Sequence, residues 1–105
     1  MPVDVSPAAA AEVREARRRL AVARTGYGRR FNEAFNTALR RLDETPRLFP
    51  PADEAPEGLE VRYVHLKRYS YQVIFVVLGE LKLIVAVAHD SQEPGYWLER
   101  LPPAS

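Results

Sequence analysis

Two arginines have the type and spacing that would suit chemistry on a phosphate group. Arg62 and Arg68 lie six positions apart in a stretch of alternating residues, which would put both on the same face of one strand. Two guanidinium groups at the two ends of such a face could bracket a phosphate with paired hydrogen bonds. The alternative is a pair at the rim of the sheet that contacts solvent or, for Arg62, the neighbouring Glu60.

His89 is the best candidate for acid–base work, because it ends the last predicted strand and because imidazole titrates near neutral pH. The alternative is a histidine that caps the strand end by bonding to Asp90 or to the backbone. His65 falls in mid-strand on the face opposite Arg62, so we expect it to be structural. Two histidines this far apart do not indicate a metal site, and the chain has no cysteine. We therefore predict no metal and no cofactor.

Three further residues are candidates for binding nucleic acid or a partner protein. Lys67 lies beside Arg68, Tyr96 could place a phenol near His89, and Arg100 could reach the same groove from the tail of the chain. Around Tyr96, however, the run Tyr-Trp-Leu is also typical of a packing anchor.

Size and composition predict one domain that spans residues 1–105 and lies in the cytoplasm. A chain of 105 residues with 47% apolar content has enough material for one core. The absence of cysteine suits a reducing compartment. The N-terminus has no basic segment followed by an apolar one, and the longest apolar run, Val73–Leu78, is too short to span a bilayer.

Charge is distributed unevenly along the chain. Residues 1–47 hold ten arginines against six acids, whereas residues 48–105 hold five Lys or Arg against eight acids. An arginine-rich half can attract polyanions or acidic proteins, but an ordinary solvated helix surface gives the same pattern.

Hydrophobic periodicity predicts two helices after a short strand at Val3 and Val5. Ser6-Pro7 is a helix start, with a capping hydroxyl followed by proline. Two glycines in 25–28 separate the helices, which we expect over 6–24 and 27–45. The inward positions expected in the first helix are Ala9, Val13, Ala16, Leu20 and Ala23, and those in the second are Phe31, Phe35, Ala38 and Leu42.

The second half of the chain predicts three consecutive antiparallel strands after a surface connector. Residues 49–58 are too rich in proline and acid to form a regular element. Alternating and β-branched residues then predict strands over 59–67, 69–78 and 81–89. Because Val73–Leu78 is apolar at every position, we expect a central strand covered on both faces. The tail should form one short helical turn whose Trp97 and Leu101 return to the body of the protein.

Together these elements predict an α+β fold in which a two-helix antiparallel hairpin packs on one face of a small antiparallel sheet, with a short strand before it and a helical turn after it. Several strings in the sequence resemble, in order and spacing, those of the RelE/ParE superfamily of toxins. They are Val5-Ser6-Pro7-Ala8-Ala9, Gly26-Tyr27-Gly28-Arg29-Arg30-Phe31, Leu42-Asp43-Glu44-Thr45-Pro46, Val61-Arg62-Tyr63, Lys67-Arg68-Tyr69-Ser70-Tyr71 and Val85-Ala86-Val87-Ala88-His89, followed by Pro94, Trp97 and Arg100. The resemblance covers residues 5–101.

This resemblance implies the toxin of a bacterial type II toxin–antitoxin system, of the plasmid stabilisation type, which inhibits growth. A cognate antitoxin would neutralise it in a hetero-oligomer. ParE-like members act as protein ligands that poison DNA gyrase, whereas RelE-like members cut messenger RNA on the ribosome. Two positions depart from the family pattern: Ser70 replaces a usual proline, and Gln92 replaces an arginine that commonly follows the strand-end histidine. The missing arginine favours the gyrase-binding interpretation.

Two alternatives stay open. The first is a ribosome-dependent messenger RNA endonuclease that uses His89 with Arg62 and Arg68, and substitution of His89 by Gln should then abolish toxicity. The second is an inactive toxin relic or interaction module that keeps the fold but poisons nothing.

Overall fold

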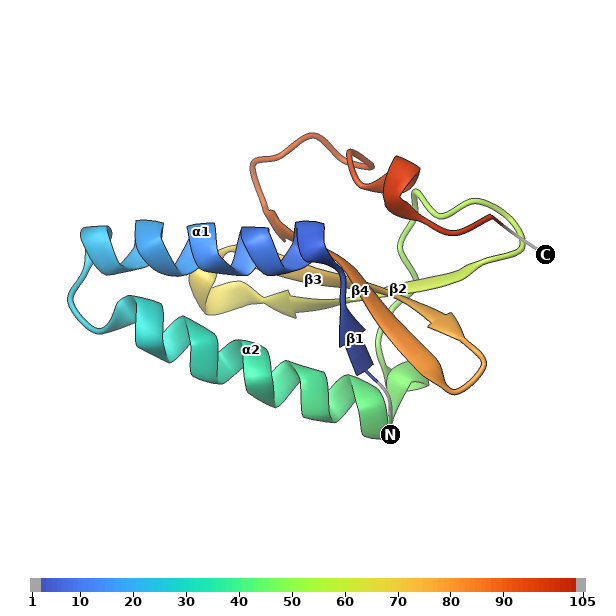
Figure 1. Ribbon diagram of the computed structural model, residues 1–105, viewed down its shortest axis with the longest axis horizontal. Helices are drawn as coiled ribbons and strands as arrows, with labels where there is room; N and C mark the ends of the chain where they lie inside the picture. The colour runs from blue at the N-terminus through green and yellow to red at the C-terminus, as the bar shows by residue number, and fades with distance from the viewer. Residues whose placement is uncertain (1–2, 104–105) are drawn as a thin grey trace.

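The two helices pack side by side against one face of a four-stranded sheet (Figure 1). The computed structural model describes residues 3–103, so four residues of the predicted domain, 1, 2, 104 and 105, lie outside it. The elements in chain order are β1 (Val3–Val5), α1 (Pro7–Ala23), α2 (Tyr27–Glu44), η1 (Pro46–Leu48), β2 (Glu60–Leu66), η2 (Lys67–Tyr69), β3 (Tyr71–Leu78), β4 (Leu81–His89) and η3 (Leu98–Arg100). No helix among the described residues has the length and apolar character needed to cross a membrane.

Helix α1 begins as predicted. Ser6 Oγ accepts a hydrogen bond from the backbone N–H of Ala9 at 3.1 Å, and Pro7 occupies the first turn. Its predicted inward positions are buried or half-buried from Ala9 to Leu20, but the prediction for Ala23 is wrong, because that residue is exposed. The last turn of α1 extends beyond the sheet (Figure 1), so no strand covers it.

Helix α2 starts directly after Gly26, whose φ of +81° is the left-handed conformation that glycine adopts most easily. All four of its predicted inward positions are buried. Gly28 has a different role, because a Cβ atom there would lie 2.6 Å from the carbonyl oxygen of Arg17. The missing side chain lets the two helices approach each other closely at the closed end of the hairpin.

The sheet has the order β1-β4-β3-β2. Strands β2, β3 and β4 are antiparallel, as predicted, but the sheet as a whole is mixed because β1 joins β4 in parallel. Parallel strands need a long connection between them, and here the α1–α2 hairpin and strands β2 and β3 lie between β1 and β4 in the chain. The apolar run of β3 lies between two neighbouring strands and is covered on both faces, which confirms its predicted central position.

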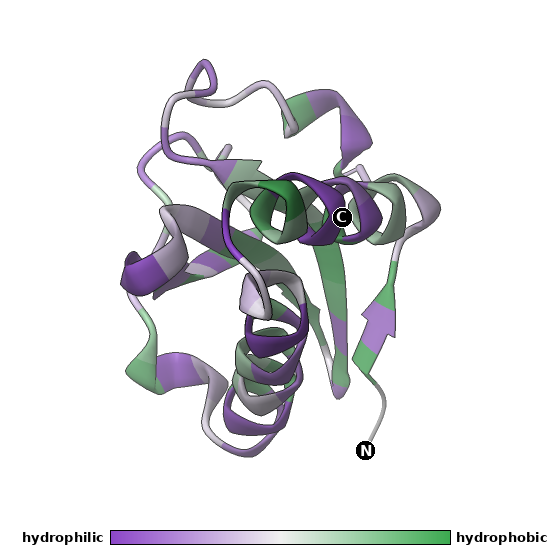
Figure 2. Cartoon of the chain, turned by 90° about the vertical axis from the view of Figure 1, so that its left-hand side faces the viewer, coloured by the Kyte–Doolittle hydropathy of each residue, from purple (hydrophilic) through white to green (hydrophobic). Residues whose placement is uncertain are grey.

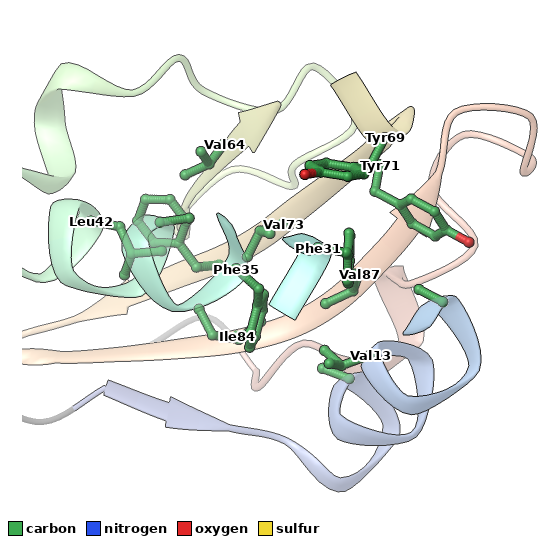
Figure 3. Packing of buried hydrophobic residues seen from close by; sticks show 14 of the residues in the cluster. Val13, Phe31, Phe35, Leu42, Val64, Tyr69, Tyr71, Val73, Ile84 and Val87 are labelled. Atoms are coloured by element: carbon green, nitrogen blue, oxygen red, sulfur yellow. The ribbon is translucent and has the colours of Figure 1, made fainter. Parts of the chain in front are cut away.

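Apolar side chains form a core on each face of the sheet. On the helix side, Phe31, Phe35 and Leu42 of α2 pack against Val73 and its neighbours (Figure 3). The hydropathy colouring agrees, since the strands are largely hydrophobic and both helices carry hydrophilic stretches (Figure 2). On the other face the core consists of Ala52, Val61, Ile74, Val76, Val85, Ala86, Ala88 and Trp97. The connector and the tail therefore cover the face that the helices leave open.

The connector over residues 49–58 is more ordered than predicted. Ala52 N–H donates to Val61 C=O at 2.9 Å, and Tyr63 N–H donates to Pro50 C=O at 3.1 Å. These bonds run along the outer edge of β2, where backbone groups would otherwise face solvent. The connector therefore protects an edge strand rather than lying free on the surface.

Candidate functional site

The first feature of interest is the outer edge of β4 beyond the point where β1 ends. Ser6 N–H donates to Ile84 C=O at 3.0 Å, and the chain then turns away into α1. A register shift in the β3–β4 pairing leaves Val85 without a partner residue. Side chains replace the missing strand here: Arg100 Nη1 donates to Val85 C=O at 3.0 Å, and Val87 N–H donates to Glu12 Oε1 at 2.9 Å.

Glu12 is the centre of this network. Besides Val87 N–H, its carboxylate accepts Arg100 Nη1 at 2.9 Å, Arg100 Nη2 at 3.2 Å and the Tyr96 hydroxyl at 2.6 Å. The Arg100 guanidinium also lies 5.1 Å from the centre of the Tyr96 ring. Both Tyr96 and Arg100, predicted as partner-binding residues, thus have internal partners.

The titration behaviour of the network follows from these contacts. Burial, followed by the hydrogen bond to Glu12, raises the pKa of Tyr96 well above its ordinary value. The hydrogen bond to Glu12 raises the pKa of the Arg100 guanidinium. The site therefore keeps a neutral phenol and a charged guanidinium around one carboxylate.

The tail holds Tyr96 and Arg100 in place through Trp97, which is only 2% exposed. The predicted return of Trp97 and Leu101 to the body is confirmed, since both belong to the core on the face opposite the helices. Glu12 is not among the site residues predicted from the sequence. The available signal was its spacing, three residues after buried Ala9 and four before buried Ala16, which puts a carboxylate on the inward flank of α1.

His89 ends β4, opposite Tyr71 of β3, and its ring packs edge-on against the Tyr71 ring with centroids 5.0 Å apart. Its Nδ1 accepts the backbone N–H of Ser91 at 3.1 Å and lies 2.7 Å from the Ser91 hydroxyl. Because a backbone N–H can only donate, the neutral ring carries its proton on Nε2. The backbone N–H of His89 donates to the Gln92 side chain at 2.8 Å, so Gln92 closes the end of the strand.

Asp90, expected as an alternative partner of His89, instead contacts His65. His65 Nε2 lies 3.0 Å from Asp90 Oδ2, and both side chains are 36% exposed. This contact joins the end of β2 to the turn after β4. His65 thus has a structural partner on the face opposite the helices.

Arg62 points to the helix side of the sheet, beside its register partner Phe75. Its Nε donates to Glu60 Oε2 at 2.8 Å, and its Nη1 donates to Phe49 C=O at 2.6 Å. With a side chain only 19% exposed, Arg62 fastens the end of the connector to β2.

The strand predicted over 59–67 ends one residue earlier than expected, because β2 ends at Leu66 and both Lys67 and Arg68 belong to the 3-10 turn η2. The expected shared strand face of Arg62 and Arg68 is therefore wrong: the alternation stops two residues before Arg68. Both Lys67 and Arg68 are exposed.

The structure does not assemble the predicted catalytic set at one place. Leu66, Tyr71 and His89 align across one end of the sheet, whereas Arg62 pairs with Phe75, four positions further along β3. At about 3.3 Å per residue this offset alone is about 13 Å. Among residues 3–103, no group of three His, Cys, Asp or Glu could hold a metal ion.

Two hollows border His89. One, of about 220 Å³, lies between α1 and the edge of β4, and Glu12, Glu15, Arg19, Tyr71 and Gln92 contribute to its lining. The other, of about 130 Å³, lies on the opposite face, and the acids in its lining are Glu54, Asp90 and Glu93. The acids of the second hollow make it a poor seat for a phosphate.

Comparison with known proteins adds a family match and a solved structure. The family described as "ParE toxin of type II toxin-antitoxin system, parDE" matches residues 3–94. The chain is also similar to a solved structure described as "Chromosomal ParDE TA system from P. aeruginosa", with 15% identity, a TM-score of 0.58, and coverage of 85% of this chain and 95% of that one. At this identity the structural likeness shows the fold alone. No curated protein matches the chain. The matched region contains Arg62, Lys67, Arg68 and His89 but ends before Tyr96 and Arg100.

Proposed function

Because the chain belongs to the ParE toxin family of type II toxin–antitoxin systems, we propose that it arrests growth by binding DNA gyrase and that a cognate antitoxin neutralises it. The solved relative, described as a ParDE system, supports the pairing with an antitoxin in a hetero-oligomer. The fold agrees with this interpretation, since it is the one shared with that relative.

The observation that carries the preference for binding over RNA cleavage is the engagement of two arginines, the catalytic candidate Arg62 and the binding candidate Arg100. Cleavage next to a 2′-hydroxyl needs cations and a titratable group around one phosphate. Arg62 instead bonds to Glu60 and Phe49, and Arg100 bonds to Glu12 and Val85. His89 is left with Ser91 and an aromatic neighbour as its ring contacts.

The test is induced expression of the wild type and of His89→Gln. We expect both to arrest growth, to co-purify gyrase and to accumulate covalent gyrase–DNA complexes, while ribosome-bound transcripts stay intact. A folded His89→Gln variant that no longer arrests growth, with transcripts cut by the wild type, would establish the RelE-like endonuclease instead. Wild-type expression without growth arrest would establish the inactive relic. Thermal unfolding of each purified protein checks that the variant is folded.

A further inference from the structure

A cationic hollow lies between the two helices at the closed end of the hairpin. Its volume is about 350 Å³, and its lining consists of four arginines with two small residues: Arg14, Arg17, Arg18, Ala21, Gly28 and Arg29. We call this surface the arginine groove. Figure 2 views the molecule from this end and shows hydrophilic stretches on both helices.

The fold brings these arginines together. Spacings of three and four place Arg14, Arg17 and Arg18 on one face of α1. Arg29 of α2 lies beside them because the two helices are very close at Gly28. A Cβ atom on Gly28 would lie 2.6 Å from the carbonyl oxygen of Arg17. Two helices thus contribute to one continuous positive surface.

The charge of the groove is largely uncompensated. Residues 13–30 contain seven arginines and a single acid, Glu15. Glu15 pairs with Arg18. Within the described range 3–103, no carboxylate forms an ion pair with Arg14, Arg17 or Arg29. All three residues are exposed, so their guanidinium groups can bind an anionic partner.

We propose that the arginine groove binds the phosphate backbone of duplex DNA. Arginine forms bidentate hydrogen bonds with phosphate, and polar, strongly positive surfaces are typical of DNA interfaces. A protein partner would need an apolar or aromatic anchor, but the only lining residues other than arginine are Ala21 and Gly28. A single strand would need aromatic side chains for base stacking, and the lining has none.

The choice of DNA rests on the proposed function, because gyrase itself holds duplex DNA and a toxin bound to it would lie close to that duplex. Contacts of this kind carry no sequence information, so we expect binding without sequence preference. If all four arginines contact phosphates, the logarithm of the binding constant should fall with the logarithm of salt concentration with a slope of about −3 to −4.

The experiment measures fluorescence anisotropy of a short labelled DNA duplex with the purified full chain over a range of salt concentrations. The test variant is Arg17→Gln/Arg29→Gln. Its matched control is Arg40→Gln/Arg47→Gln, which removes the same charge from exposed positions outside the groove. We expect the test variant to bind the duplex at least about tenfold more weakly than the wild type, with a salt slope smaller in magnitude by about two. The affinity of the control should stay within about twofold of the wild type. Unfolding curves confirm that both variants are folded.

Three outcomes would overturn the proposal. The first is that the wild type does not bind duplex DNA, and the second is that both variants lose the same DNA affinity. The third is that the wild type binds poly-glutamate, single-stranded DNA or duplex RNA more tightly than duplex DNA. Failure of the proposed function would look different. Gyrase would then stay unaffected in cells expressing the toxin, whatever the purified chain does with DNA. Conversely, a chain that traps gyrase but shows no DNA affinity would contradict only the arginine groove.

Discussion

Glu12 and Arg100 are 88 positions apart in the chain, yet the Arg100 guanidinium donates to both carboxylate oxygens of Glu12, at 2.9 and 3.2 Å. The pair joins the first helix to the tail. It also supplies a donor for Val85 C=O and an acceptor for Val87 N–H at the point where β1 ends. A side-chain pair therefore completes the hydrogen bonding of a strand edge, and the tail depends on it for its position.

Substitution of Glu12 by Gln should destabilise the protein by about 2 kcal/mol, because Val87 N–H and Arg100 lose a charged acceptor in a partly buried place. For a chain of this size the melting temperature should fall by about 10 °C. Arg100→Gln should have a similar effect, and the double variant should cost less than the sum of the two. Urea unfolding measures all three. The control is Glu15→Gln, which removes a pair with exposed Arg18 on the surface of α1 and should change stability by less than about 0.5 kcal/mol. Equal losses at Glu12 and Glu15 would show that the network adds nothing.

Tyr96 should make the folded protein sensitive to alkaline pH. Burial and the hydrogen bond to Glu12 raise the pKa of Tyr96 above its ordinary value of 10.0. A raised pKa means that folding favours the protonated phenol, so this contribution to stability is fully present below pH 10 and is lost as pH rises toward the folded-state pKa. In Tyr96→Phe this part of the alkaline decline should disappear, although the variant loses the hydrogen bond and is less stable at neutral pH. Urea unfolding at neutral pH and above pH 10 measures the difference, and a parallel alkaline decline in both proteins would contradict it.

The elements that the sequence predicts best are those whose periodicity reflects burial. The positions Phe31, Phe35, Ala38 and Leu42 repeat with the helical period, and all are buried, because one helix face meets the sheet. Strand β4 is predicted to the residue, since the Gly79-Glu80 turn and Asp90 limit it on either side. Local patterns have this power only where the neighbouring residues determine the outcome.

What the sequence does not predict are contacts between distant segments. Glu12 meets Tyr96 and Arg100 through tertiary packing, and no local pattern encodes that meeting. The same holds for Arg62, whose partner Phe49 lies in the connector. The predicted end of β2 is one residue too late, because polar Lys67 follows apolar Leu66 as the alternation requires, whereas the backbone already turns into η2 at Lys67.

Arg62 should contribute to stability. Substitution by Met would leave Phe49 C=O without its guanidinium donor and would leave Glu60 with Arg47 as its cationic partner, at a cost of about 1–3 kcal/mol. Arg68→Met, at an exposed position in η2, should change stability by less than about 0.5 kcal/mol. Chemical unfolding compares the two, and it should be paired with growth assays at a temperature where both variants are folded. Loss of growth arrest in folded, stable Arg62→Met would show that Arg62 also acts on the target.

Ser70 gives the sharpest backbone prediction. It adopts φ +63° and ψ +41°, the left-handed conformation. Proline holds φ near −65°, so it does not fit this backbone. Ser70 N–H also donates to Lys67 C=O at 3.2 Å, a bond that proline lacks the hydrogen to make. Ser70→Pro should therefore destabilise the protein by about 3 kcal/mol or more.

Ser70→Gly should have the opposite effect. Relief of the left-handed strain is worth about 1–2 kcal/mol, and the greater freedom of glycine in the unfolded chain offsets about 0.5–1 kcal/mol of it, so the net gain should be about 0.5 kcal/mol. Gly79 provides the matched control, since it has the same φ of +63° and open space around its missing Cβ. Gly79→Ser should cost about as much as Ser70→Gly gains. Thermal unfolding of the three variants measures the expected gain in stability of Ser70→Gly and the expected losses of Ser70→Pro and Gly79→Ser.

A Ser70→Pro variant as stable as the wild type would contradict the left-handed backbone at this position. The turn after η2 would then have to adopt a different conformation. The hydrogen bond from Asp90 N–H to Ser70 C=O, which links this turn to the end of β4, would be in question as well.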